Sequence, residues 1–223
     1  MGVYIFTKAQ ASRQIALSES HLKKARVILA KGLPLVDVDK IHMNFYLEAF
    51  EAASKSIEAN SMNSEAYALR ARARTLLGQY SEAIADAEKA ISINPDSWNA
   101  FFARANAKGF LDDKKGQMMD FDKTISINPG FASAYFNRAN LKQSNGDQDG
   151  AISDYSNAIA LEWNLAESFN ARADSYFKMN KLQESCKDFK RAIDLYRESD
   201  ESQYESSMTW LNSAGGAWCK DMN

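Results

Sequence analysis

Histidine, cysteine and proline are scarce in this chain of 223 residues, which contains two, two and three of them, respectively. His21 and His42 are accompanied by no HExxH pattern, no Gly-rich phosphate loop and no nucleophile elbow. Cys186 and Cys219 are too few for a zinc site, and their spacing matches no redox motif. We therefore expect no catalytic residues, no metal site and no cofactor.

Long apolar runs and a strong excess of one charge are also missing. The chain has no run of eighteen apolar residues, so we expect no transmembrane helix. The formal net charge is -2, and no basic cluster suggests a nucleic-acid partner. We expect a cytoplasmic protein in which Cys186 and Cys219 are reduced, although a tail that folds back would bring them together.

What the chain does contain is an internal repeat with a period of 34 residues. Two charged positions recur in every unit: Arg70, Arg104, Arg138 and Arg172, and Asp86, Asp120, Asp154 and Asp188. Counted from Ser64, the units are 64–97, 98–131, 132–165 and 166–199. A period of this length is typical of helix-turn-helix solenoids, in which each unit buries its apolar face by stacking on the next.

Small and large apolar residues also keep fixed places within each unit. Position 4 is always aromatic, position 8 is always alanine and position 28 is always isoleucine. The pattern predicts helices over about residues 65–77 and 81–93, with equivalents in the later units. A shared turn position holds Gly78, Asp112, Gly146 and Asn180. Because Gln117 replaces a small residue where two helices approach closely, we expect the second unit to be the loosest.

These aromatic and alanine positions, together with Pro95 and Pro129 at position 32, resemble the tetratricopeptide repeat family over residues 64–199. The resemblance implies an all-α fold, a right-handed superhelix of antiparallel helix pairs with terminal capping helices. It also implies a non-enzymatic module that binds proteins. The closing residues 210–219 are similar to the tail of small bacterial, in particular cyanobacterial, proteins of this family.

We expect one solenoid domain with three parts. Residues 1–63 form an N-terminal helix and a degenerate first unit, because Ala49 and Ala53 lie one period before Ala83 and Ala87. Residues 64–199 form the four regular units. Residues 200–223 form a capping helix and a tail, since the last unit of a solenoid otherwise exposes its interface.

The recurrent arginines and aspartates are interpreted as a structural ladder of ion pairs, with ligand contact as the alternative. The two positions lie on the two helices of one hairpin, so a guanidinium can reach a carboxylate of its own unit or of the next one. Such pairs specify packing more reliably than they add stability.

In the family that the chain resembles, partners bind in a concave groove lined by the first helix of each hairpin. At the matching positions this chain has aromatic, amide and charged residues: Arg72, Phe102, Asn106, Phe110, Phe136, Asn140, Asn170, Asp174 and Phe177. They suit an extended peptide or a partner helix. The alternative is that some of the phenylalanines pack between units as core.

One subclass of the family binds C-terminal carboxylates through a clamp of basic residues and asparagines. Asn106 and Asn137 match its asparagines, but Phe102, Glu167 and Ala171 occupy its basic positions. We therefore expect an adaptor or assembly scaffold that binds another kind of protein segment. The alternative is a structural solenoid that self-associates through its terminal caps, with its groove filled by its own tail or left empty.

Overall fold

The computed structural model describes residues 19–26, 40–162, 164–199, 201–212 and 216–220, and regular structure in these residues is helical throughout. The chain divides into two compact units, residues 1–127 and 128–223, which are described separately. The all-α fold predicted from the sequence is confirmed. The single continuous solenoid stays a prediction.

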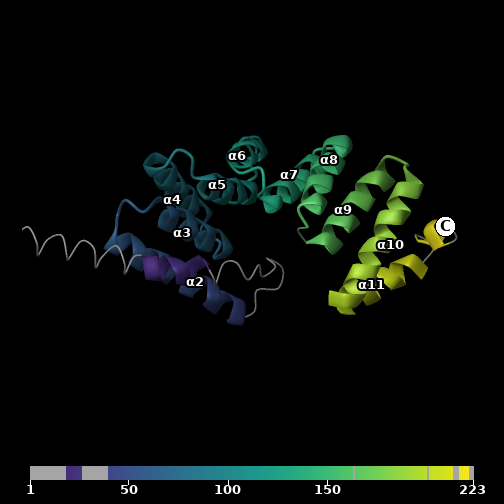
Figure 1. Cartoon of the computed structure of the whole chain (residues 1–223), viewed down its shortest axis with the longest axis horizontal. Helices are drawn as coiled ribbons and strands as arrows, with labels where there is room; N and C mark the ends of the chain where they lie inside the picture. Colours follow the sequence, from purple (N-terminus) through teal and green to yellow (C-terminus); the bar gives the residue numbers. More distant parts are fainter. Residues whose placement is uncertain (1–18, 27–39, 163, 200, 213–215, 221–223) are drawn as a thin grey trace, which may run out of the picture. The chain divides into compact units, whose positions relative to one another are not determined.

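The first unit contains two complete helix hairpins and a further long helix that packs on the first of them (Figure 1). Its helices are α2 (Lys40–Ala59), α3 (Ser64–Leu76), α4 (Tyr80–Ile93), α5 (Trp98–Phe110) and α6 (Lys114–Ile127). Residues 19–26 are also helical, and Leu22 and Ala25 are buried in one apolar cluster with residues of α2 and α3. Asp39, which by its residue type and place is a candidate N-cap for α2, lies outside the described residues.

The second unit contains two more hairpins, followed by a capping helix and a short helix in the tail (Figure 1). Its helices are α7 (Ala132–Ser144), α8 (Gln148–Ala160), α9 (Leu165–Lys178), α10 (Leu182–Ser199), α11 (Glu201–Asn212) and α12 (Ala217–Lys220). Helix α11 covers α10, and Tyr204 packs against the buried Ala192 and Tyr196. This helix matches the predicted cap.

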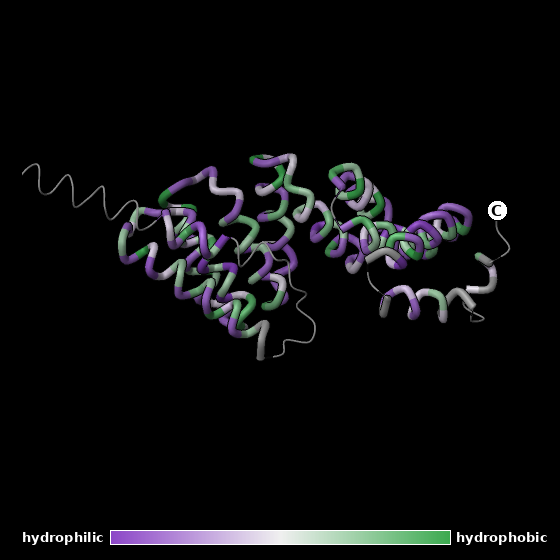
Figure 2. The backbone as a smooth tube through the Cα atoms, turned by 60° about the horizontal axis from the view of Figure 1, so that its bottom comes forward, coloured by the Kyte–Doolittle hydropathy of each residue, from purple (hydrophilic) through white to green (hydrophobic). Residues whose placement is uncertain are grey.

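Alanines allow the helices to approach closely. In the first unit Ala71, Ala87 and Ala103 from three successive helices form one cluster, and each is fully buried. In the second unit Ala139 of α7 and Ala151 of α8 belong to one cluster in the same way, together with the fully buried Tyr155. Figure 2 shows apolar and polar residues alternating along the helices, as expected for helices that bury one face in a stack.

The turn within each hairpin uses the shared position predicted from the sequence. Gly78 and Gly146 have φ values of 77° and 86°, and Asp112 and Asn180 both have 59°. A left-handed residue at the end of a helix satisfies carbonyl groups that the helix leaves unpaired. The next helix then begins at a cap in two cases: the Asp113 and Asp147 carboxylates accept hydrogen bonds from the backbone N–H of Gly116 and Gly150, respectively.

The misfit expected at Gln117 is relieved by a glycine on the facing helix, which was not predicted. A Cβ atom on Gly109 would lie 2.5 Å from the Gln117 amide nitrogen, so the missing side chain on α5 makes room for the glutamine of α6. The other units have the reverse arrangement at these two positions, as in Thr75 against Ala83.

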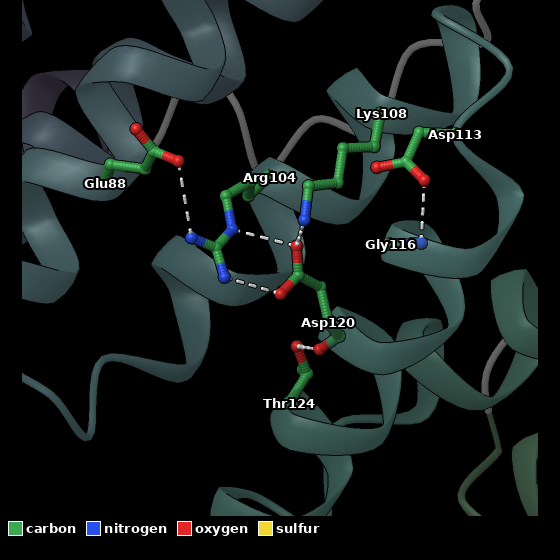
Figure 3. A network of polar contacts seen from close by, with 7 residues as sticks. All are labelled: Glu88, Arg104, Lys108, Asp113, Gly116, Asp120 and Thr124. Carbon is green, nitrogen blue, oxygen red and sulfur yellow. Dashed lines mark hydrogen bonds and ion pairs between the residues drawn. The ribbon is translucent and has the colours of Figure 1, made fainter.

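One ion pair joins the two helices of every hairpin. Arg70, Arg104, Arg138 and Arg172 each donate two hydrogen bonds, of 2.6 to 2.9 Å, to the carboxylate of the aspartate sixteen residues later. The aspartate side chains are only 3% to 8% exposed. Figure 3 shows the pair in the second hairpin, where Arg104 and Asp120 face each other. Bidentate geometry of this kind is both strong and directional.

Two further contacts surround each pair. A second cation binds the same aspartate in three hairpins: Arg74, Lys108 and Lys142, each at 2.8 Å. In the fourth hairpin Tyr176 occupies this position, and Arg172 lies over its ring. The aromatic residue three positions before each arginine also lies under the guanidinium, at 5.4 to 5.7 Å from its centroid. The second cation was not among the residues predicted from the sequence.

We predict that Arg138→Ala destabilises the fold by at most about 3 to 5 kcal/mol, the cost of leaving a buried carboxylate unpaired, because Lys142 still contacts Asp154 and offsets part of that cost. Urea unfolding of Arg138→Ala, Asp154→Ala and the double variant measures this. The double variant should lose less than the sum of the single losses. The control is Arg191→Ala, which removes an exposed arginine of α10. A loss for Arg138→Ala no larger than that of the control would contradict a structural role of the pair.

We also predict that Gly146→Ala destabilises the second unit by about 1 to 2 kcal/mol, because a Cβ atom is disfavoured in the left-handed conformation. Space is not the cause, since an added Cβ atom would meet nothing within 4 Å. Gly130→Ala is the matched control: it also lies in a turn, it has no positive φ, and its nearest neighbour would be 3.6 Å away. Equal melting temperatures for the two variants would show that the backbone conformation at residue 146 is unimportant.

Candidate partner-binding face

In the first unit the predicted groove residues come from α3 and α5, and one of them is not accessible. Phe102 is only 4% exposed, and its ring lies 5.9 Å from that of the fully buried Phe121. The prediction that Phe102 offers a surface to a partner is therefore wrong. Phe102 is buried because position 24 of this repeat is Phe121, whose ring packs against that of Phe102 across the hairpin. Phe102 is core, the alternative that the sequence left open.

The other residues on this face of the first unit are half-buried or exposed. Arg72 and Asn106 are half-buried, and burial lowers the pKa of Arg72 from its usual value. Phe110 is exposed at the end of α5, where its ring stacks on Tyr80 at 4.6 Å. The face therefore offers one amide, one cation and one aromatic ring.

In the second unit Phe136 and Asn140 come from α7 and make contacts with α8. Phe136 is half-buried and meets the Tyr155 ring edge-on at 5.6 Å, so it contributes to the core as well as to the face. Asn140 is exposed, and its side-chain oxygen accepts a 2.6 Å hydrogen bond from the Tyr155 hydroxyl. Burial raises the pKa of Tyr155, and the nearby Asp174 carboxylate raises it further. Tyr155 therefore remains a hydrogen-bond donor that orients the Asn140 amide.

Asn170, Asp174 and Phe177 form an exposed stripe along α9, because residues three and four apart lie on one face of a helix. Asp174 makes a 2.6 Å ion pair with Lys178, in which both side chains are about half exposed. The stripe lines a pocket of about 430 Å³ that also involves α10, α11 and α12. Its walls include Asn170, Asp174, Phe177, Phe189, Ser206 and Trp218.

The tail closes one side of this pocket. Trp218 of α12 stacks on Phe177 at 5.5 Å, with 25° between the ring planes. The next residue, Cys219, forms a disulfide with Cys186 of α10, and both cysteines are almost fully buried. The expectation of two reduced thiols is therefore wrong. Spacing along the chain carried no signal, because the pairing depends on how the tail folds back. A disulfide of this kind typically stabilises by about 2 to 4 kcal/mol.

The described residues contain no group of three His, Cys, Asp or Glu side chains that could hold a metal ion. No helix in the described part of the chain has the length and hydropathy to cross a membrane. What the face does provide is amides, one carboxylate and stacked aromatic rings. Such groups bind the backbone and side chains of a peptide.

Models of the tetratricopeptide repeat family match residues 64–97, 121–153 and 166–199. No curated protein matches the sequence.

Several solved structures share the fold. The chain is similar to TTC0263, a tetratricopeptide repeat protein of Thermus thermophilus, with a TM-score of 0.65, 18% identity and coverage of 85% of this chain and 99% of that one. It is similar to MamA, with a TM-score of 0.59, 20% identity and coverage of 85% and 96%. It is also similar to YrrB, described as having an unusual peptide-binding site, with a TM-score of 0.58, 18% identity and coverage of 74% and 84%. The repeat matches, together with the helix hairpins, place the chain in the tetratricopeptide repeat family.

Proposed function

We propose that the chain is a non-enzymatic scaffold that binds a segment of a partner protein on the face formed by α7 and α9. The observation that carries the proposal is the exposure of Asn140, Asn170, Asp174 and Phe177 on these two helices. YrrB, which shares the fold, is described as having a peptide-binding site. The partner segment is an extended peptide or a helix.

The chemistry of the face suits a peptide backbone. Asn140 uses its oxygen to accept from Tyr155, which directs its amide N–H groups outward as donors. Asn170 offers both a donor and an acceptor, so the two asparagines can pair with a peptide in either direction. Phe177 supplies the apolar surface that anchors a side chain of the partner. On the first unit, Arg72, Asn106 and Phe110 are candidates for further contacts.

We also propose a bacterial source for the chain. The disulfide between Cys186 and Cys219 favours an oxidising compartment over the cytoplasm that the sequence suggested, because disulfides persist mainly in oxidising compartments.

We predict that Asn140→Ala and Asn170→Ala each weaken partner binding about fivefold, since a net hydrogen bond contributes about 1 kcal/mol. Partners are captured from a lysate of the source organism on the oxidised full chain, identified by mass spectrometry and titrated in purified form. Asn157→Ala is the matched control, because it removes an exposed asparagine from α8, the second helix of the same hairpin. Equal affinity of the partner for all three variants would show that it binds elsewhere on the chain.

Self-association through the caps is the second candidate. Its support is that the tail already contacts the face, with Trp218 stacked on Phe177. Sedimentation equilibrium over a wide range of concentration distinguishes the two functions. A mass that rises with concentration favours a homo-oligomer, and a constant monomer mass supports the scaffold.

A further inference from the structure

The pocket at the end of α9 has a definite chemical character. Its volume of about 430 Å³ lies within the usual range for ligand sites, roughly 300 to 1,000 Å³. Among the described residues that line it, Asp174 alone carries a charge. The other walls are aromatic, from Phe177, Phe189 and Trp218, or neutral, from Asn170, Ala173 and the serines of α10 and α11.

We infer that this pocket binds an arginine side chain of the partner segment and that the disulfide-anchored tail forms part of the site. The inference rests on the proposed scaffold function and names the side chain that its second unit recognises. The carboxylate of Asp174 neutralises the guanidinium. Asn170 and Ser206 provide oxygen acceptors for its remaining N–H groups.

Aromatic stacking selects arginine over lysine. The Phe177 and Trp218 rings are nearly parallel, at 25°, and both border the pocket. A planar guanidinium stacks on aromatic faces and pairs with a carboxylate through two parallel hydrogen bonds, whereas an ammonium is a compact, strongly hydrated charge. Phe177 remains 47% exposed even with the tail in place, so the tail adds a wall without filling the pocket.

Lys178 is the competitor that an arginine must displace. Its ammonium contacts the Asp174 Oδ2 atom at 2.6 Å, but both side chains are about half exposed. Exposed pairs of this kind are weak, and solvent and salt screen them. An incoming guanidinium can approach the Oδ1 atom while Lys178 turns into solvent. Lys178→Ala should therefore tighten arginine binding.

The tail holds its place through a covalent link. Cys186 belongs to α10 and Cys219 to α12, so the disulfide fixes the residue next to Trp218 against the last hairpin. Helix α12 has only four residues, which are too few to form a stable helix alone. Without the disulfide it would therefore not keep its conformation. The aromatic wall thus depends on the disulfide.

The test is to titrate each probe into the oxidised full chain and to monitor binding by the NMR signals of the backbone amides of Asn170 and Phe177. The probes are N-acetyl-arginine amide, its neutral isostere N-acetyl-citrulline amide, and N-acetyl-lysine amide. We expect arginine amide to bind about fivefold more tightly than either of the others, which is the gain from about one net hydrogen bond at a partly exposed carboxylate. Equal affinity for arginine and citrulline, or tighter binding of lysine, would overturn the inference.

Variants assign the roles of the residues. Asp174→Asn should abolish the preference for arginine over citrulline, whereas Asp194→Asn, an exposed aspartate of α10, should retain it. Trp218→Ala and the Cys186→Ser/Cys219→Ser double variant should each weaken arginine binding about fivefold, and Trp218→Phe should keep most of it. Unchanged affinity in Asp174→Asn or in both tail variants, with helicity retained by circular dichroism, would contradict the assignment.

The outcome is separable from that of the proposed function. Partner capture that depends on Asn140 and Asn170, together with no preference for arginine amide, would refute the pocket alone. Arginine binding in the pocket without any captured partner would refute the scaffold function and leave the pocket in place.

Discussion

The bidentate ion pair between an arginine on the first helix of each hairpin and an aspartate on the second is the contact on which the hairpins depend. It is nearly buried, it recurs in all four regular hairpins, and an aromatic ring lies under each guanidinium. A buried carboxylate is costly unless it is paired with good geometry. The pair therefore penalises any rotation that would part the two helices, while the alanines permit the close approach that it requires.

The ion pair fixes one side of the first helix of each hairpin, and the opposite side stays accessible to a partner. In α9 the arginine of the pair is Arg172, whereas Asn170, Asp174 and Phe177 are exposed. In α7 the same division separates Arg138 from the exposed Asn140. The repeat thus fixes the direction in which these side chains point before any partner arrives. Preorganisation of this kind reduces the entropy lost on binding.

Features that recur with the period were predictable from the sequence, because periodicity reports contacts that every unit makes. The helices, the left-handed turn residues and the partners of the recurrent arginines belong to this class. Contacts that occur in only one unit were not predictable. Gly109 accommodates Gln117, and the tail pairs Cys219 with Cys186, each through a contact that no other unit repeats among the described residues. The burial of Phe102 against Phe121 belongs to the recurrent class instead, because Phe136 and Tyr155 meet at the same two positions of the next repeat. The second cation, as in Lys108, does recur, and a search for basic residues four positions after each arginine would have found it.

The central claim is that the first helices of the second unit receive the partner. Hydrogen–deuterium exchange of the oxidised full chain, with and without a saturating captured partner, tests it most directly. The account predicts added protection in α9 and at the end of α7 that carries Asn140, with α8 unchanged. Protection confined to the second helices α8 and α10, with α7 and α9 unaffected, would contradict it.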